Sequence, residues 1–551
     1  MSYHHKAASK TSLKKLLSTS ALIAVGIVSL SSLPAHADNA WVLDQVGGSF
    51  DTDTSIDAIT QITQNSSRAI GQGNLDIAAH QTVNIHQNSS SDLFVARDNK
   101  SDPTKILGNL NANGRVMVID GNGVFFSHES VVNVGSIIVS TNDISNAEIM
   151  SGRDDFVFDD LGDADASIAL NGTINIADAG LAAFVSPLIT NNGVINAKLG
   201  TVAFAAGQSV TLDLYGDGLM EIAVNGELAD ALLENTGQIN AEGGTVQISA
   251  LAAKDAVDSI INVEGLITVS SVEEQGGQII LSGGDKGTVS ISGTLDASGT
   301  TGGDIKVTGQ HLVADSGAAL QASGTNGGGT ILFGGEFQGG GDTPTSQTAL
   351  VAQTATLSAN ADADGNGGEV VVWSDDSTEF YGSIEAKGGA NSGNGGLVEV
   401  SGSSLLYQGT ADTTALNGNT GWLLLDPLGI RVFHSAADNI FLSSSPVLAI
   451  TDTALNTSLG LSNVLLATSP SQATYEDVGG GGLFGEQTNP IANDDNITVE
   501  DGVDIDTGAN TLYFSTSTLN LYSTIIGNVS GGVGSPFTPA GITLKDPTTV
   551  N

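Results

Sequence analysis

The chain has 551 residues, of which 71 are glycine, 11 are proline and none is cysteine, and only 5% are aromatic. This composition argues against several compact, aromatic-cored domains, and the 40% apolar content argues against a disordered linker. The 17 basic and 60 acidic residues give a net charge of −43, which repels nucleic acid and anionic membranes and argues against both as partners.

The first 37 residues are predicted to be a signal peptide. A head with four lysines precedes an apolar centre at 21–33, and Ala35 and Ala37 frame a small-x-small cleavage site. We expect cleavage after Ala37; a retained amino-terminal anchor is the alternative. Cleavage leaves 13 basic and 60 acidic residues, so the mature charge is 13 − 60 = −47. No later segment approaches 18 consecutive apolar residues, so we expect no membrane insertion.

Short strands recur through the rest of the chain. Segments such as 191–207, 235–250 and 286–299 each contain an Asn- and Gly-rich turn and four or five residues that alternate Val, Ile or Leu with Thr, Ser or Asn. Pairs of glycines precede several strands, at 243–244, 276–277, 302–303, 367–368 and 395–396. The pattern runs from about 70 to 535, which is long for a β-sandwich, the main alternative, and typical of a solenoid.

The predicted fold class is therefore all-β, a right-handed parallel β-helix (β-solenoid) in which strands of successive coils stack about 4.8 Å apart. An open solenoid end exposes unpaired strand edges, so a cap is needed. The segment WVLDQVGGSF (41–50) contains aromatic residues and lies outside the repeating pattern. We predict that it forms the amino-terminal cap.

The stretch GNLNANGRVMVIDGNGVFF (108–126) places two apolar bursts after two groups of Asn, Gly and Asp. In a β-helix such polar residues take the left-handed conformations of the corners. We expect VMVI and VFF to supply residues that point into the coil.

Residues 106–144 resemble the amino-terminal secretion domain of the filamentous haemagglutinin family, the passengers of two-partner secretion. The family pattern has a G-x-L-x-A-N-G strand, an INPNGI corner and a V-x-V-G-G-L-x-A-S-T segment. The positions that match are Gly108, Leu110, Ala112, Asn113, Gly114, Val132, Val134, Gly135, Ser140 and Thr141. The corner departs from the pattern, with Asp120 in place of Asn and Gly121 in place of Pro. Both substitutes accept turn conformations.

The resemblance implies a two-partner secretion domain at 38–270 and a Gly-rich β-helix continuation at 271–430. A β-rich carboxy-terminal segment follows at 431–551; a short family member, a cleavage product and a truncated frame all stay open. The predicted secretion-motif residues are Asn109, Asn111, Asn113, Gly114, Asp120, Gly121, Asn122 and Gly123.

The resemblance also implies a Gram-negative bacterium and an outer-membrane two-partner secretion transporter as partner. The chain would pass the periplasm, cross the outer membrane unfolded and coil outside, as a secreted or surface-exposed adhesin. Its receptor would be a host-cell or matrix glycan or protein. No cofactor is expected.

Two alternatives stay open: a carbohydrate-active β-helix enzyme, and a surface or matrix spacer without specific binding. For the enzyme, paired carboxylates occur at 154–155 and 159–160, where a hydrated acidic loop is the simpler interpretation. We therefore predict no enzyme activity. Asp362, Asp364 and Asn366 reproduce the first half of a calcium loop, but Trp373 stands where a bidentate Glu belongs, so the site is a weak candidate.

Overall fold

The computed structural model describes residues 39–213, 221–225, 228, 231–251, 260–270, 276–434, 448–468, 496–499, 503–515, 518–521 and 524–531. The predicted signal peptide, with Ala35 and Ala37, lies outside these residues. Residues 39–551 form one unit, built mainly of parallel strands. Within its described part no helix is long and apolar enough to cross a membrane.

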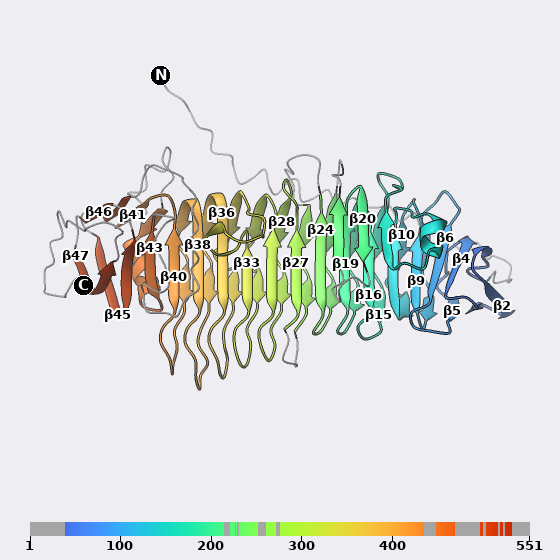
Figure 1. The fold of residues 1–551 in the computed structure, drawn as a ribbon, viewed down its shortest axis with the longest axis horizontal. Coiled ribbons are helices and arrows are strands. Elements are labelled where there is room, and N and C mark those ends of the chain that lie inside the picture. The colour runs from blue at the N-terminus through green and yellow to red at the C-terminus, as the bar shows by residue number, and fades with distance from the viewer. Residues whose placement is uncertain are drawn as a thin grey trace, which may run out of the picture. The chain divides into compact units, whose positions relative to one another are not determined.

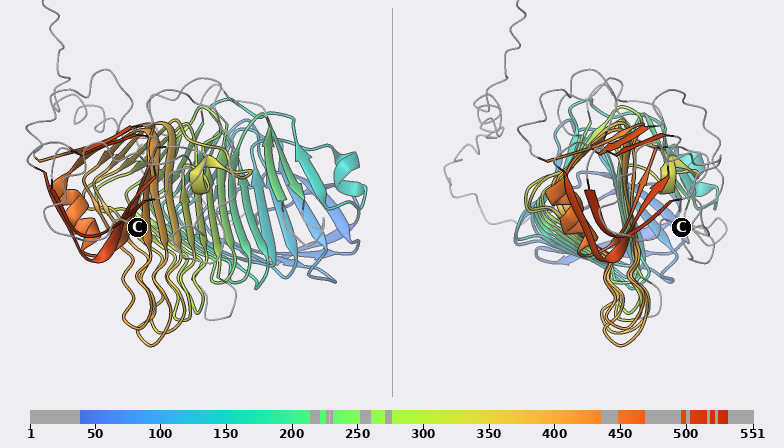
Figure 2. Two further views of the ribbon diagram at one scale, coloured as in Figure 1. Left: turned by 60° about the vertical axis from the view of Figure 1, so that its left-hand side comes forward. Right: turned by 90° about the vertical axis from the view of Figure 1, so that its left-hand side faces the viewer.

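From β6 to β39 the strands of successive coils lie on three faces (Figures 1 and 2). The coil that begins with β9 (Arg115–Ile119) continues through β10 (Val124–Phe126) and β11 (Val131–Val134). The next coil begins with β12 (Ser136–Ser140), which pairs with β9 in parallel, Ile137 opposite Val116. Each strand therefore lies beside a strand that follows it by one whole turn, which confirms the predicted parallel β-helix.

The first face comprises β4 (Arg68–Gly73), β6 (Leu93–Asp98), β9, β12, β16 (Leu181–Val185), β19 (Thr201–Ala206), β24 (Thr245–Ala250), β27 (Gln278–Ser282), β30 (Asp304–Thr308), β33 (Thr330–Phe333), β36 (Glu369–Phe380), β38 (Leu397–Tyr407), β40 (Trp422–Asp426), β43 (Asn463–Ala467), β45 (Asp504–Ser515) and β47 (Thr524–Gly531).

The second face comprises β7 (Thr104–Ile106), β10, β14 (Ser167–Leu170), β17 (Leu188–Asn191), β22 (Leu232–Asn235), β25 (Ile261–Val263), β28 (Thr288–Ile291), β31 (His311–Ala314), β34 (Thr348–Val351), the second halves of β36 and β38, β42 (Leu448–Thr451), β41 (Ile430–Phe433), β44 (Asn496–Val499) and β46 (Thr518–Leu521).

The third face comprises β3 (Ile59–Gln64), β5 (Thr82–His86), β8 (Asn109–Ala112), β11, β15 (Thr173–Ile176), β18 (Val194–Asn196), β23 (Gln238–Asn240), β26 (Leu266–Thr268), β29 (Thr294–Asp296), β32 (Ala319–Gln321), β35 (Thr356–Ser358), β37 (Ser383–Glu385) and β39 (Thr410–Asp412).

Side chains that alternate inward along these strands fill one continuous apolar core from the cap to Phe514. Aromatic residues of neighbouring coils meet inside it, as Phe184 and Phe204 do with ring centroids 5.5 Å apart. Each coil buries its apolar side chains against the coils on either side, which is the main source of stability in a solenoid.

The segment 41–50 caps the amino-terminal end, as predicted. β1 (Asp44–Gly47) and β2 (Phe50–Ile56) run antiparallel to β4 and β3 and interrupt the parallel ladders. Trp41 is buried, and its Nε1 donates a hydrogen bond to the Leu75 carbonyl at 2.6 Å. Phe50 meets Phe94 of the second coil edge to face at 5.2 Å. The apolar interior is thereby closed to water.

Few elements depart from the coils. A small antiparallel sheet of β13 (Asp155–Phe158), β20 (Ser209–Asp213) and β21 (Glu221–Asn225) lies outside them, next to helix α2 (Asn146–Met150). Helix α3 (Asp452–Leu459) and the short 3-10 turn η1 (Phe337–Gly339) interrupt later coils. Loops between the third and first faces project as a row of parallel loops, seen along the lower edge of Figure 1.

Candidate secretion-motif site

The predicted motif residues span the end of one coil and the start of the next, and the structure separates them into two groups. Asn109 and Asn111 lie on β8, and Asn113 and Gly114 form the corner that follows it. The corner at 120–123 begins at the other end of the five-residue strand β9. The motif is therefore two successive corners and one face of a coil, not one compact cluster.

Asn111 belongs to a ladder of stacked asparagines on the third face. Its Nδ2 donates to Asn84 Oδ1 at 2.9 Å, and its own Oδ1 accepts from Asn133 Nδ2 at 2.9 Å. The ladder continues through Asn175, Asn196 and Asn240, with donor–acceptor distances of 2.8 to 2.9 Å. Each amide satisfies part of its hydrogen-bonding capacity with the next coil, so the ladder holds the strands in register.

The corner after β8 is closed around the buried side chain of Gln87. Asn113 bonds the Gln87 backbone twice, accepting from its N–H and donating to its carbonyl, both at 2.8 Å. Gln87 Nε2 in turn donates to Gln64 Oε1, Asp92 O and Arg115 O. A Cβ on Gly114 would lie 2.6 Å from Gln87 Oε1. Gly114 is therefore required by the close approach of the preceding coil.

The corner after β9 is organised by the carboxylate of Asp120, which is 2% exposed. One oxygen accepts from the Thr104 N–H and hydroxyl, both at 2.8 Å, and the other accepts from the Asn122 N–H and side-chain amide, both at 2.9 Å. Nearby Asp98 accepts from Thr104 Oγ1 at 3.3 Å; burial raises the pKa of Asp98, and the Asp120 charge adds to the shift. The substitution of Asp for the family's Asn thus gives a fully bonded turn.

Gly123 and Gly121 differ in whether their positions could accept a residue with a Cβ. Gly123 has φ +121°, and a Cβ there would lie 2.7 Å from the Ser167 carbonyl. Gly121 has no such restriction, since a Cβ would make only an ordinary 3.4 Å contact with Gly162. At this corner the backbone therefore demands glycine at position 123 but not at position 121.

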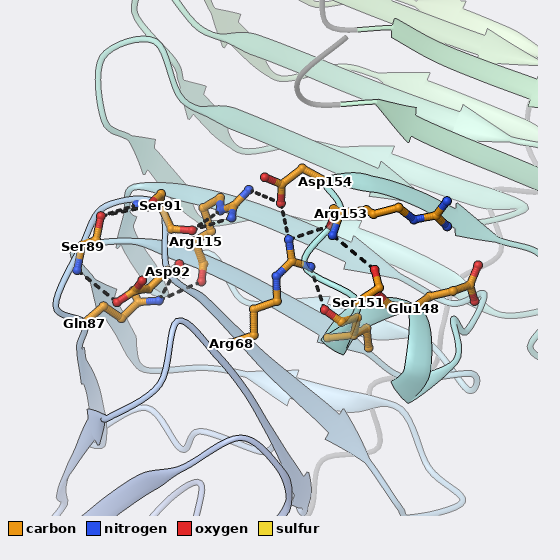
Figure 3. Close-up of polar contacts among 11 residues, drawn as sticks. Arg68, Gln87, Ser89, Ser91, Asp92, Arg115, Glu148, Ser151, Arg153 and Asp154 are labelled. Carbon is orange, nitrogen blue, oxygen red and sulfur yellow. Dashed lines mark hydrogen bonds and ion pairs between the residues drawn. The ribbon is translucent and has the colours of Figure 1, made fainter.

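Arg115 lies between the two motif corners, directly after Gly114, and its side chain pairs with Asp154, a partner that the sequence pattern did not predict (Figure 3). Its guanidinium donates to Asp154 Oδ1 at 2.9 Å and to the Ser91 carbonyl. Arg68 donates to the same Asp154 oxygen at 2.6 Å and to the carbonyls of Ile149 and Arg153. One carboxylate thus neutralises two largely buried guanidiniums, and burial lowers the pKa of Arg68.

These contacts fasten a second apolar core, outside the coils. In VMVI, Val116 and Val118 point into the β-helix as expected, but Met117 and Ile119 belong to this outer cluster with Phe156 and other residues of the outer sheet. In VFF, Phe125 is 39% exposed. Both bursts therefore supply inward residues as expected, Val124 and Phe126 in the case of VFF, while the alternate residues face out of the coil. The uninterrupted apolar run of β9 was the missed signal, because strands buried on both sides lack alternation.

The paired carboxylates suggested for catalysis do not converge. Asp154 is committed to Arg68 and Arg115, and Asp155 pairs with Arg153 at 3.4 Å on an exposed edge. Asp160 enters a backbone bridge with Asp143. Across the described ranges no group of three or more His, Asp or Glu side chains is arranged to hold a metal ion.

The weak calcium candidate lies in the row of projecting loops, seen end-on as a narrow ridge in Figure 2. Asp364 accepts from Ser392 Oγ at 2.9 Å and Asn391 Nδ2 at 3.2 Å, and Asn366 Oδ1 accepts from the Asn394 N–H at 2.8 Å. Asp362 is exposed. Two of the three side chains therefore join this loop to the next one in the row.

Comparison with known proteins identifies relatives of this capped parallel β-helix. The family described as "TPS secretion domain" matches residues 49–307. The crystal structure of the HMW1 secretion domain from Haemophilus influenzae aligns with a TM-score of 0.60 and 25% identity, covering 70% of this chain and 99% of that one.

A second relative is the heme/hemopexin-binding protein of Haemophilus influenzae strain Rd, 23% identical over 237 residues. The match covers 42% of this chain and 25% of the relative, so the chain spans about a quarter of that protein's length. Residues 49–307 therefore carry a two-partner secretion domain, the amino-terminal domain of exoproteins that are exported by that route.

Proposed function

We propose that this protein is an adhesin-type exoprotein. Its signal peptide directs it to the periplasm, an outer-membrane two-partner secretion transporter exports it, and it folds as a β-helix at the cell surface or in the medium. The observation that carries the proposal is the secretion-domain match at 49–307, on a β-helix capped by residues 41–50. Folding outside supplies a physical drive, because each new coil buries apolar surface and pairs with the coil before it.

Export is tested in the source bacterium by deleting, one at a time, its outer-membrane transporter genes of the two-partner class. We expect one deletion to remove the full chain from the medium and surface, as measured by antibody, while transcript levels hold. A chain that lacks residues 38–270 but retains residues 1–37 should fail in the same way. Unchanged export in both experiments would refute the proposed route.

The adhesive role is supported by the outward row of the third face, which carries the asparagine ladder and is suited to weak, repeated contacts with a glycan or protein surface. The test is binding of the purified mature chain to host cells and matrix glycans, beside a panel of polysaccharides assayed for released reducing sugar. Saturable binding without sugar release supports the adhesin. Sugar release would favour an enzyme. Altered matrix architecture without binding would favour a spacer.

A further inference from the structure

The outer sheet is attached to the coils without sharing their ladders. β13 pairs with β20, and β20 with β21, all antiparallel. None of the three pairs with a coil strand within the described ranges. The segment that contains α2 and β13 leaves the coils at Thr141, whose N–H donates to Val185 O, and returns near Asp163, whose N–H donates to Gly121 O. Lifting it would therefore break no strand pairing of the β-helix.

Side chains, not backbone, hold this outer cover, by which we mean α2, β13, β20 and β21. Its apolar residues Ile149, Phe156, Phe158, Val210 and Leu212 pack on an apolar strip of the first face. The strip consists of Ile70, Leu93, Val95, Met117, Ile119, Ile138, Leu181, Ala183, Val185, Ala203 and Ala205. All of them are at most 3% exposed, so the strip is dry only while the cover is in place.

Arginines of the coils provide the polar attachment. Arg68 and Arg115 converge on Asp154, next to β13, and Arg97 on β6 donates to Asp143 at 2.8 Å and to the Ile144 carbonyl at 2.8 Å. These three are among only five arginines in the chain. Because Asp154 pairs with two guanidiniums that are about a tenth exposed, its loss would remove a buried counter-charge from both at once.

We propose that the outer cover is a separately opening unit. It lifts from folded coils when the Asp154 contacts break, and it exposes the apolar strip, which spans strands β4, β6, β9, β12, β16 and β19. The closed and open states differ by side-chain packing and by the arginine contacts, and the hydrogen-bonded ladders are the same in both. This inference goes beyond the proposed function and does not depend on it.

One consequence does rest on the proposed function. β4, β6, β9 and β12 precede β13 in the chain, and β16 and β19 precede β20 and β21. If export proceeds from the amino terminus, the part of the strip on β4, β6, β9 and β12 is outside before β13 arrives, and the part on β16 and β19 is outside before β20 and β21 arrive. Each part of the strip would then be uncovered for a time during every export event.

The test is hydrogen exchange of the full mature chain, followed by mass spectrometry, for the wild type, Asp154→Ala and Asp155→Ala. We expect Asp154→Ala to speed exchange in β13 and β20 by about a hundredfold, since breaking a buried charge pair is strongly destabilising. Exchange in β9 and β12 should not change, and binding of an anionic hydrophobic dye should rise. Asp155 is the matched control, because it is the adjacent residue, the first of β13, with a 41% exposed side chain and a longer ion pair of 3.4 Å to Arg153.

Parallel acceleration in β9, β12 and β13 would show that cover and coils open together and would overturn the proposal. Should Asp154→Ala fail to fold, hydrogen exchange of the wild type still tests the proposal. In low denaturant concentrations its β13 and β20 amides must exchange through an opening that costs less than the opening of β9 and β12. Equal opening free energies for the four strands would refute a separate unit. A chain that is not exported by a transporter could still pass this test.

Discussion

Gly244 lies directly against Gly200 of the preceding coil: a Cβ on Gly244 would be 2.0 Å from the Gly200 carbonyl oxygen. Gly303, Gly368 and Gly396 stand in the same relation to the glycine one coil earlier. Each of these four residues is the second glycine of a Gly-Gly pair and stands immediately before a first-face strand. Together they form a column along the β-helix. The column is a line of backbone contacts too close for any side chain.

We expect Gly244→Ala to destabilise the fold by about 3 kcal/mol, because the clash is with backbone and cannot be relieved by rotating a side chain. Gly121→Ala is the control, since its Cβ would meet only Gly162 Cα at 3.4 Å. Urea denaturation of the two variants measures the difference. Equal midpoints would show that the coils can separate at the column without cost.

Asparagines in the middle of the ladder should contribute to the free energy of unfolding. Asn133→Ala removes the hydrogen bond to Asn111 and the one from Asn175, and we expect a loss of about 1 to 2 kcal/mol. Asn99→Ala, at an exposed turn, should change the free energy of unfolding by less than about 0.5 kcal/mol. Denaturation midpoints of both variants check this, and a ladder variant as stable as wild type would contradict a structural role.

Two variants of Asp120 distinguish a role in folding from a role in recognition by the export partner. Asp120→Ala removes a buried carboxylate that accepts four hydrogen bonds, two from Thr104 and two from Asn122, and we expect it to cost about 2 to 3 kcal/mol. Asp120→Asn keeps an oxygen acceptor at the same place and should cost less. Thermal unfolding ranks the two variants. If Asp120→Asn folds normally but is not exported, the carboxylate itself is read by the export partner.

The pH dependence of stability should reflect a buried carboxyl far from the motif. Glu399 on β38 is fully buried; its Oε2 accepts from the Gln338 N–H of η1 at 2.8 Å. Burial raises the pKa of Glu399 to about 8, and burial raises the pKa of Asp426 on the adjacent strand to about 7. Glu369 lies in the same region. Burial raises its pKa, and the charge of Glu336 adds to the shift.

Because the folded pKa of Glu399 lies above its unfolded value, the native state holds the extra proton. The stabilisation is fully present below about pH 4.5 and is lost as the pH rises through about 8. The free energy of unfolding should therefore fall between these values, and Glu399→Gln should flatten that fall. Denaturant titrations at pH 5 and pH 9 measure it. An identical pH slope in Glu399→Gln would remove Glu399 as the cause.

Much of the coil architecture was predictable from local pattern. The alternation in 235–250 fixed which side chains point inward, and the aromatic segment around Trp41 was recognisable as a cap because it broke that pattern. What the alternation could not reveal was the outer cover. The run VMVI in β9 and the acidic stretch around Asp154 look unrelated in sequence, and their partnership depends on Arg68, which is 86 residues away from Asp154.

The sequence by itself determined the repeating unit, because strand alternation and corner glycines are local properties that each coil expresses within about twenty to forty residues. It also carried the resemblance that pointed to secretion. Only the tertiary structure decided the roles of the motif's polar side chains, since the partners of Asn111, Asn113 and Arg115 come from other coils. Stacking brings such residues together at each turn, and no spacing along one strand encodes which of them will meet.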